Sequence, residues 1–229
     1  MDDLFSDRAV RDQHLTRADV ERLAASAPCH LVDCDLEEAD LSGLDLSRWR
    51  FERCNVRRAA LNGAKLEGTA WTVCRGAFAN FMGSALGDAT FASCDFNNGT
   101  FKRATLTSAR FERCKLTGVD LSETGAMGIA FVETLLISAK LPGFSFRKES
   151  LRQVDFSQAD LRKCDFRATT FEGCSLRDAN MAGSRFDGAD LRGVDLGGLR
   201  LVDASLFRGA TISREQAAGL LSELGLNVR

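Results

Sequence analysis

The sequence of 229 residues predicts a repeat array in which short units stack into a solenoid, rather than a globular domain of mixed helices and strands. A large apolar residue recurs at every fifth position from Leu31 to Leu206. This frame has 36 positions, of which 19 are Leu and 12 are Phe. A period of five fits neither an α-helix, with about 3.6 residues per turn, nor an ordinary strand, with a period of about 2. The positions that depart from Leu or Phe are Val56, Trp71, Gly76, Ala126 and Met181.

A second observation is the small residue that stands two positions before most of the large ones. The segment from Ala159 to Lys163 shows the pattern, which is small, polar, large apolar, polar, polar. All eight cysteines occupy the small position. The repeat unit is therefore a pentapeptide with two inward and three outward side chains.

A third observation is a longer period of four pentapeptides, which the cysteines reveal. Cys34, Cys54, Cys74, Cys94 and Cys114 follow one another at this interval, and Cys174 lies a whole number of such intervals after Cys34. Phe51, Phe91, Phe111 and Phe171 form a matching aromatic column three residues earlier in each turn, together with Trp71 and Phe131. If successive turns stack at the inter-strand spacing of about 4.8 Å, both columns become ladders of the core. The 36 positions then make nine coils of four repeats.

This pattern resembles the pentapeptide-repeat family. The resemblance implies an all-β solenoid, namely a right-handed quadrilateral β-helix with four pentapeptides per coil. It covers residues 29–210, which we expect to form one domain.

Both ends lie outside the repeat, and we expect helical caps there. Residues 1–28 predict one or two helices, since Thr16 and Asp19 fit a capping box before an apolar face. Residues 211–229 predict a C-terminal helix, with Ser213 and Gln216 as its cap and Gly225 as its stop. Such lids cover coil ends that would otherwise expose unpaired backbone.

The cysteine column invites two sharper interpretations, a disulfide ladder and a zinc site. Stacked Cα atoms about 4.8 Å apart lie within disulfide range. However, Thr134, Val154 and Val194 interrupt the column, and the chain has no CxxC spacing and only two histidines. We therefore expect the cysteines to be small apolar fillers of the core, with no metal and no cofactor.

No pattern in the sequence indicates an enzyme. The chain has no tyrosine, and its aspartates recur at one repeat position instead of forming a singular cluster. At that position a carboxylate bonds backbone N–H groups of a turn. A signal peptide and an apolar run long enough to cross a bilayer are both missing, so we expect a cytoplasmic protein without a membrane partner and with reduced thiols.

Two short stretches resemble a subgroup of the family, the quinolone-resistance proteins and related protectors of DNA gyrase. One is the segment from Gln216 to Leu226, which is similar to their dimerising helix, and the other runs from Ala126 to Ile129. The resemblance implies a homodimer that binds DNA gyrase or topoisomerase IV in place of DNA and protects it from an inhibitor. The implied dimer interface is Ala217, Leu220, Leu221, Leu224 and Leu226.

Charge supports DNA mimicry only in part. Residues 1–50 carry 12 acids and 6 bases, residues 51–150 carry 9 and 13, and residues 151–229 carry 11 of each. Aspartates in two columns of the coil are the candidate partner-binding residues: Asp35, Asp95, Asp155 and Asp195 in one, and Asp40, Asp120 and Asp160 in the other. Arg75 and Lys115 interrupt the first column, so the predicted acidic stripe is patchy.

The sequence is also compatible with two other functions. A structural or interaction scaffold with a different protein partner would use the basic middle segment as its contact surface. Direct binding of nucleic acid by that segment is disfavoured by a pI near 5.8 and by aromatics placed inside the coil. Residues 125–150 form the least regular stretch, which predicts either a poorly filled coil or a small inserted loop.

Overall fold

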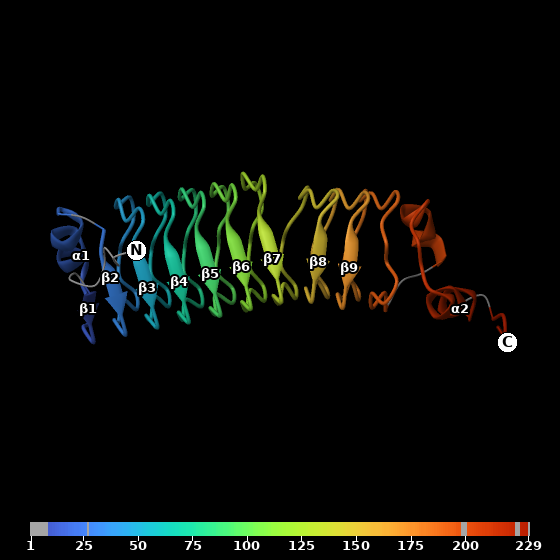
Figure 1. Cartoon of the computed structure of the whole chain (residues 1–229), viewed down its shortest axis with the longest axis horizontal. Coiled ribbons are helices and arrows are strands. Elements are labelled where there is room, and N and C mark those ends of the chain that lie inside the picture. The colour runs from blue at the N-terminus through green and yellow to red at the C-terminus, as the bar shows by residue number, and fades with distance from the viewer. Residues whose placement is uncertain (1–8, 27, 198–200, 223–224, 229) are drawn as a thin grey trace, which may run out of the picture. The chain divides into compact units, whose positions relative to one another are not determined.

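A computed structural model of the chain describes residues 9–26, 28–197, 201–222 and 225–228. It comprises two compact units, Met1–Thr134 and Leu135–Arg229, each with its own core. In both units short parallel strands repeat along the chain, as Figure 1 shows. The predicted β-solenoid is therefore confirmed.

The strands are three residues long, and from β2 onward each begins at the interval that the cysteines predict. In the first unit they are β1 (Ala9–Arg11), β2 (His30–Val32), β3 (Arg50–Glu52), β4 (Ala70–Thr72), β5 (Thr90–Ala92), β6 (Arg110–Glu112) and β7 (Ala130–Val132). In the second unit they are β8 (Ser150–Arg152) and β9 (Thr170–Glu172). The α-helices among the described residues are α1 (Arg17–Ala24) and α2 (Arg214–Ser222).

Each strand pairs in parallel with the strand one coil away, and from β2 onward the register is the predicted four pentapeptides. Phe51 lies opposite Trp71 in the first unit, and Leu151 lies opposite Phe171 in the second. The other three sides of a coil are joined by single bridges, of which Asn55–Arg75 is one. Four such contact points in each turn of the chain give the coil four sides.

A left-handed residue closes the turn of every pentapeptide. Every fifth residue from Asp33 to Gly193 has a positive φ, although only some of these residues are glycines. Val73 (φ 56°) and Phe78 (φ 63°) are bulky residues that rarely adopt this conformation. Their N–H groups donate to Ala92 O and Asn97 O of the next coil, both at 2.9 Å. The ladder between coils therefore holds even bulky residues in the conformation that the turn requires.

Stacked rings fill the interior where the sequence places its aromatic column. In the first unit the rings of Phe51 and Trp71 are 3.8 Å apart between centroids and inclined by 4°, and those of Phe91 and Phe111 are 4.5 Å apart at 4°. In the second unit Phe166 stacks on its neighbours of the adjacent coils. The predicted core residues Phe51, Phe91, Phe111 and Phe171 are all buried.

Packing explains why a glycine, Gly76, occupies a position of the repeat where a large apolar residue is expected. A Cβ atom built on Gly76 would lie 2.1 Å from Cε1 of Phe96, which stands at the same repeat position one coil later. The ring of Phe96 therefore fills the space that a side chain at residue 76 would use. The core keeps its density although one position of the frame carries no side chain.

The N-terminal cap contains one predicted and one unpredicted element. The capping box of α1 is present, since Thr16 accepts from the N–H of Asp19 and the Asp19 carboxylate accepts from the N–H of Thr16. Strand β1, however, precedes α1 in a segment for which the sequence predicts only helix. Val10 pairs with Leu31, and the interval between these two residues is one residue longer than the regular interval between coils. Strand β1 is therefore shifted by one residue relative to the five-residue repeat, and the sequence pattern misses it for this reason.

The repeat also ends earlier than residue 210. A 3-10 helix occupies Leu201–Phe207. Thr211 then bridges to Asp190, and the interval between these two residues is again one residue longer than the regular interval between coils. At the end of a solenoid a strand finds no further coil to pair with, and a short helix satisfies its backbone groups locally. The predicted cap of α2 is confirmed, because Ser213 Oγ and the Gln216 side chain each accept from the other's backbone N–H.

The stretch of residues 125–150 holds no inserted loop. In the first unit Gly125 bridges to Thr105, and β7 begins five residues later as the repeat requires. In the second unit Leu135 bridges to Asp155, and the five-residue turns continue to β8. Ala126 is half-buried, whereas most large frame residues are fully buried. The alternative of a poorly filled coil is therefore correct.

The contact of Gly76 with Phe96 predicts a non-additive pair of substitutions. Gly76→Leu overpacks the core and should lower the free energy of unfolding by roughly 1–3 kcal/mol. Phe96→Ala leaves a cavity and should cost roughly 3–5 kcal/mol. In the double variant the leucine enters the vacated space, so its loss should be smaller than the sum of the single losses. Urea unfolding of the four proteins measures this coupling, and additive losses would contradict the packing described.

Candidate partner-binding surfaces

Three side chains of each pentapeptide point outward, and they form the surface of the coil. The residue before the large one makes the bridge to the next coil, and the two residues after it form the turn. The small and the large residues point inward, and most of them are buried. Because the chain returns to the same side after four pentapeptides, outward residues one coil apart form a column across successive coils.

The seven candidate aspartates all stand at the bridge position and all serve the backbone. In each case Oδ1 accepts a hydrogen bond from the N–H two residues later, at 2.9 to 3.2 Å. The aspartates are Asp35, Asp40, Asp95, Asp120, Asp155, Asp160 and Asp195. The turn role expected from their repetition is confirmed, and it leaves one oxygen of each carboxylate for other partners.

In the first unit the candidate aspartates do not come together. Asp35 and Asp95 lie three coils apart in one column, with Asn55 and Arg75 between them. The Asn55 amide donates to Oδ1 of Asp35 at 2.8 Å, so this carboxylate is engaged by the next coil as well as by its own turn. In the neighbouring column, uncharged residues of three coils separate Asp40 from Asp120.

In the second unit arginines neutralise two of the three candidates. Arg162 forms a two-point pair with Asp160 at 2.7 Å, and Arg177 bonds Asp195 at 2.9 and 3.1 Å. Asp155 and Asp195 are two coils apart, with Ser175 between them. Neither unit therefore carries an unbroken acidic stripe over its described residues, as the patchy columns of the sequence predict.

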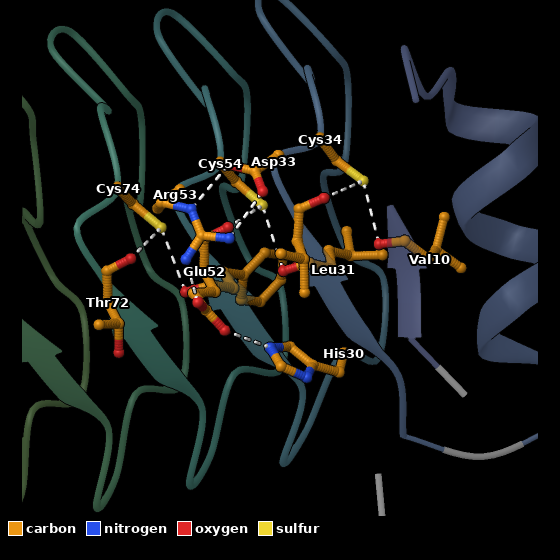
Figure 2. Close-up of polar contacts among 12 residues, drawn as sticks. Val10, His30, Leu31, Asp33, Cys34, Glu52, Arg53, Cys54, Thr72 and Cys74 are labelled. Atoms are coloured by element: carbon orange, nitrogen blue, oxygen red, sulfur yellow. Dashed lines mark hydrogen bonds and ion pairs between the residues drawn. The ribbon is translucent and has the colours of Figure 1, made fainter. Parts of the chain in front are cut away.

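The cysteine column lies inside the coil, where Figure 2 shows Cys34, Cys54 and Cys74 on successive coils. All eight thiols are free and buried, so a disulfide ladder is absent. Thiols of the column also have a polar role that the sequence does not reveal. Cys74 Sγ donates to Phe51 O of the preceding coil at 3.2 Å, and Thr134 Oγ1 makes the same bond to Phe111 O at 3.3 Å.

These bonds correct the expectation of a purely apolar filler. Threonine can replace cysteine in the column because both fit the small position and both can donate to the same carbonyl. Burial raises the pKa of Cys174, and it raises the pKa of Cys164, which fills the small position on another side of the coil, to about 12. These thiols are thus held protonated as donors and are not poised as nucleophiles.

A hollow of about 480 Å³ follows the cysteine column on the surface of the first unit. Its floor is Cys74 and Cys94, and outward residues on either side of the column form its walls. The wall residues are Asp33, Arg53, Val73, Ser93, Arg113, Arg75, Asp95 and Lys115. An adjoining hollow of about 390 Å³ continues it along the column to Cys34 and Asp35. We call the two together the cationic groove.

Helix α2 presents apolar side chains that its own unit does not bury. It has no buried residue, and Leu221 near its end and Leu226 just beyond it are 38% and 52% exposed. Gln216 ties the helix to the last coil by donating to Leu191 O and Val194 O at 2.8 and 2.9 Å. Ala217 and Leu220 are half-buried, whereas Leu224 lies outside the described residues. The predicted interface thus stays a prediction with an exposed apolar surface in its favour.

Neither a metal site nor a membrane-crossing helix occurs in the described part of the chain. No group of three or more His, Cys, Asp or Glu residues there is arranged to hold a metal ion. No described helix has both the length and the apolar character needed to cross a bilayer.

A family model of pentapeptide repeats matches residues 29–68, 84–122, 131–167, 159–198 and 169–206. These segments cover more than half of the chain, and most of their described residues lie in the coils of the structure. The chain belongs to the pentapeptide-repeat family. A comparison with curated protein sequences found no significant match.

Solved structures of other pentapeptide-repeat proteins share the fold. A trypsin-treated variant of QnrB1, a plasmid-mediated fluoroquinolone resistance protein, is 22% identical with a TM-score of 0.65 and covers 88% of this chain and 98% of its own. HetL, a pentapeptide-repeat protein involved in heterocyst differentiation regulation in Nostoc sp. strain PCC 7120, is 16% identical with a TM-score of 0.50, over 86% of this chain and 94% of its own. Proteins with different roles thus share this architecture.

The arginine–aspartate pairs of the second unit predict a pH dependence that one substitution removes. Arg167 bonds Asp165 at 2.8 and 2.5 Å, and these bonds lower the pKa of Asp165 to about 2. A carboxyl whose pKa falls on folding stabilises the fold above its unfolded pKa, near 3.9, and this contribution disappears as the pH falls toward about 2. Arg167→Gln should raise the pKa of Asp165 and flatten the loss of stability between about pH 4 and about pH 2.

The carboxyl pKa can be followed by NMR, and stability by thermal unfolding. Arg147 is the matched control, because it occupies the same repeat position one coil earlier and has no ion pair among the described residues. Arg147→Gln should leave the acid profile unchanged. If both variants follow the wild-type profile, the pair does not contribute to acid stability.

Proposed function

We propose that this pentapeptide-repeat protein is a non-enzymatic binding protein that engages DNA gyrase or topoisomerase IV and protects it from an inhibitor. The observation that carries the proposal is the fold shared with QnrB1 over 98% of that protein, which is described as a fluoroquinolone resistance protein. It is supported by the resemblance of the segment from Gln216 to Leu226 to the dimerising helix of gyrase protectors. A cytoplasmic location, as expected from the sequence, is part of the proposal.

The surface chemistry supports binding rather than catalysis. The outward residues are repeated turn residues, and their carboxylates bond backbone N–H groups of their own turns. A solenoid of this kind offers long regular sides to a partner. The family model that matches the chain describes pentapeptide repeats, and the proposal requires no covalent chemistry.

The distribution of acids bears on how a topoisomerase would be engaged. In the first unit acidic residues gather in the coils that follow β2, although Arg17 lies 3.3 Å from Asp40 and Arg53 pairs with Asp33. Asp95 and Asp155 form no ion pair within 4.0 Å among the residues that the structure describes. The proposed DNA-like contact would therefore involve only some coils.

We also propose that the protein dimerises through α2. The helix is anchored to the last coil by Gln216, and its unit leaves Leu220 half-exposed and Leu221 exposed. Exposed leucines at the end of a chain can meet their own copies in a two-fold interface, since such an interface uses the same patch twice. The resemblance to the dimerising helix points to the same residues.

A second candidate function is a scaffold for a protein partner other than a topoisomerase. The observation in its favour is the cationic groove, whose charge does not imitate that of DNA. HetL shows that the family fold also occurs in a protein involved in the regulation of differentiation. The experiment below separates the two functions.

Protection can be measured in a DNA gyrase supercoiling reaction that contains a cleavage-stabilising quinolone. Under the proposal, the purified protein restores supercoiled product in a concentration-dependent manner and binds the gyrase subunits. A reaction without the drug shows whether the protein itself inhibits supercoiling. If the protein restores no supercoiled product at any concentration and binds neither gyrase nor topoisomerase IV, the scaffold function is favoured instead.

The dimer is tested by Leu220→Glu combined with Leu221→Glu. Carboxylates at these positions should repel their copies, because burying an unpaired charge in an apolar interface is strongly unfavourable. The mass measured by light scattering should then fall to half, while the circular dichroism spectrum of the solenoid stays the same. Arg214→Glu, at the exposed start of α2, is the control for added negative charge. An unchanged mass in the double variant would remove this interface.

A further inference from the structure

We propose that the cationic groove of the first unit binds an extended acidic segment of a partner protein. The groove is distinct from α2 and from the candidate aspartates, apart from Asp35 and Asp95 in its walls. It does not depend on a topoisomerase being the partner.

The groove arises from the geometry of the repeat. Cysteine side chains point inward at the small position, so the surface above them is low. The left-handed turn residues on one side of the cysteine column and the bridge residues on the other side stand higher and form two walls. The walls run from coil to coil, in the direction in which the coils stack. An extended chain laid in this direction would pass each coil in turn.

Some charges of the groove are already neutralised. Arg53 donates to both carboxylate oxygens of Asp33, at 2.8 and 2.7 Å, as Figure 2 shows. Arg113 pairs with Glu112 and lies 3.5 Å from the Ser93 hydroxyl. These two arginines are thus held in place by acidic or polar neighbours.

Two other cations of the groove form no ion pair of this kind. Arg75 and Lys115 are both exposed, and neither has an ion pair with any residue that the structure describes. They stand in one column, two coils apart, with Asp95 between them. The two backbones are therefore about 10 Å apart at the spacing of parallel strands. Asp95 already accepts from the N–H of Asn97 and stands between two cations, so this part of the groove keeps an excess of positive charge.

This arrangement fits a polypeptide with spaced carboxylates. In a polyproline II segment, which is extended and has three residues per turn with a rise of about 3.1 Å, residues three positions apart lie on the same side of the chain and about 9 Å apart. Two such carboxylates would pair with Arg75 and Lys115, and a neutral residue between them would face Asp95. Val73, which is 49% exposed in the opposite wall of the coil that carries Arg75, offers an apolar contact beside the carboxylate bound there.

Nucleic acid fits the groove less well. A continuous phosphate chain would meet Asp33 and Asp95 as well as the cations, and like charges repel. No aromatic side chain lines either hollow, so bases would find no stacking platform there. An acidic polypeptide avoids both problems, because its charges are spaced and its side chains include apolar ones.

The test uses the full-length protein and fluorescence anisotropy with three labelled probes. The first is a peptide of repeated Glu-Pro-Pro, which favours polyproline II and places carboxylates three residues apart on one side. The second is the corresponding Gln-Pro-Pro peptide, and the third is an oligothymidylate. We expect the first probe to bind, the second not to bind, and the affinity of the first to fall as salt rises from about 0.05 to about 0.5 M.

Arg75→Ser combined with Lys115→Ser should weaken binding of the first probe by about tenfold, since two exposed ion pairs are lost. Serine is compatible with the position, because Ser145 and Ser175 occupy the same place in other repeats. The matched control is Arg48→Ser combined with Arg57→Ser, which removes two exposed cations outside the groove. The control should bind as the wild type does.

Several results would overturn the proposal. Equal loss of affinity in both double variants would mean attraction by net charge alone. Tighter binding of the oligothymidylate than of the acidic peptide, with loss in Arg75→Ser/Lys115→Ser, would assign the groove to nucleic acid. Absence of binding by the first probe would remove the site. Because the assay contains no topoisomerase, none of these results bears on inhibitor protection.

Discussion

The constant register between successive coils, four pentapeptides of chain to each turn, is the constraint on which the structure depends. It brings each large apolar residue over its counterpart, and it allows the backbone N–H groups of one coil to find carbonyl groups of the next. The same ladder holds a left-handed residue at the turns, even where Val73 or Phe78 occupies the position. Stability is therefore distributed along each unit, because every coil supports its neighbours. One local departure, the missing side chain at Gly76, is absorbed by the ring of Phe96 from the neighbouring coil.

The register also determines what the surface can present. The two inward residues of each repeat are committed to packing, and the bridge aspartates are committed to their own turns. Charge on the surface is then decided by short contacts between outward residues of the same or adjacent coils, of which Arg162–Asp160, Arg177–Asp195 and Arg53–Asp33 are examples. Most of these pairs are exposed, so each contributes little to stability, but together they decide which charges are left for a partner.

This surface bears directly on the proposed function. A protein that imitates DNA along its whole length would need unpaired carboxylates in successive coils, and the candidate columns of neither unit provide them over the described residues. The first unit instead combines acidic coils near its start with a cationic groove that begins beside them at Asp33 and continues along the cysteine column to Lys115. Partner recognition by such a surface would depend on which part of a unit is engaged. The fold shared with QnrB1 and HetL is compatible with either outcome, since the family architecture supports more than one role.

The sequence by itself determined the five-residue frame, the length of the coil, the inward columns and the capping box of α1. These features follow from periodicity, because every inward position repeats the same environment. Only the tertiary structure decided where the repeat ends, since Val10 and Thr211 join the solenoid one position out of phase with the pattern. It also decided that the cysteines are hydrogen-bond donors and that Arg75 and Lys115 stand beside a groove without an ion pair among the described residues. Periodicity shows which residues stack on one another, but the bonds and ion pairs that they form, and the register at the two ends, are set by contacts between neighbouring coils.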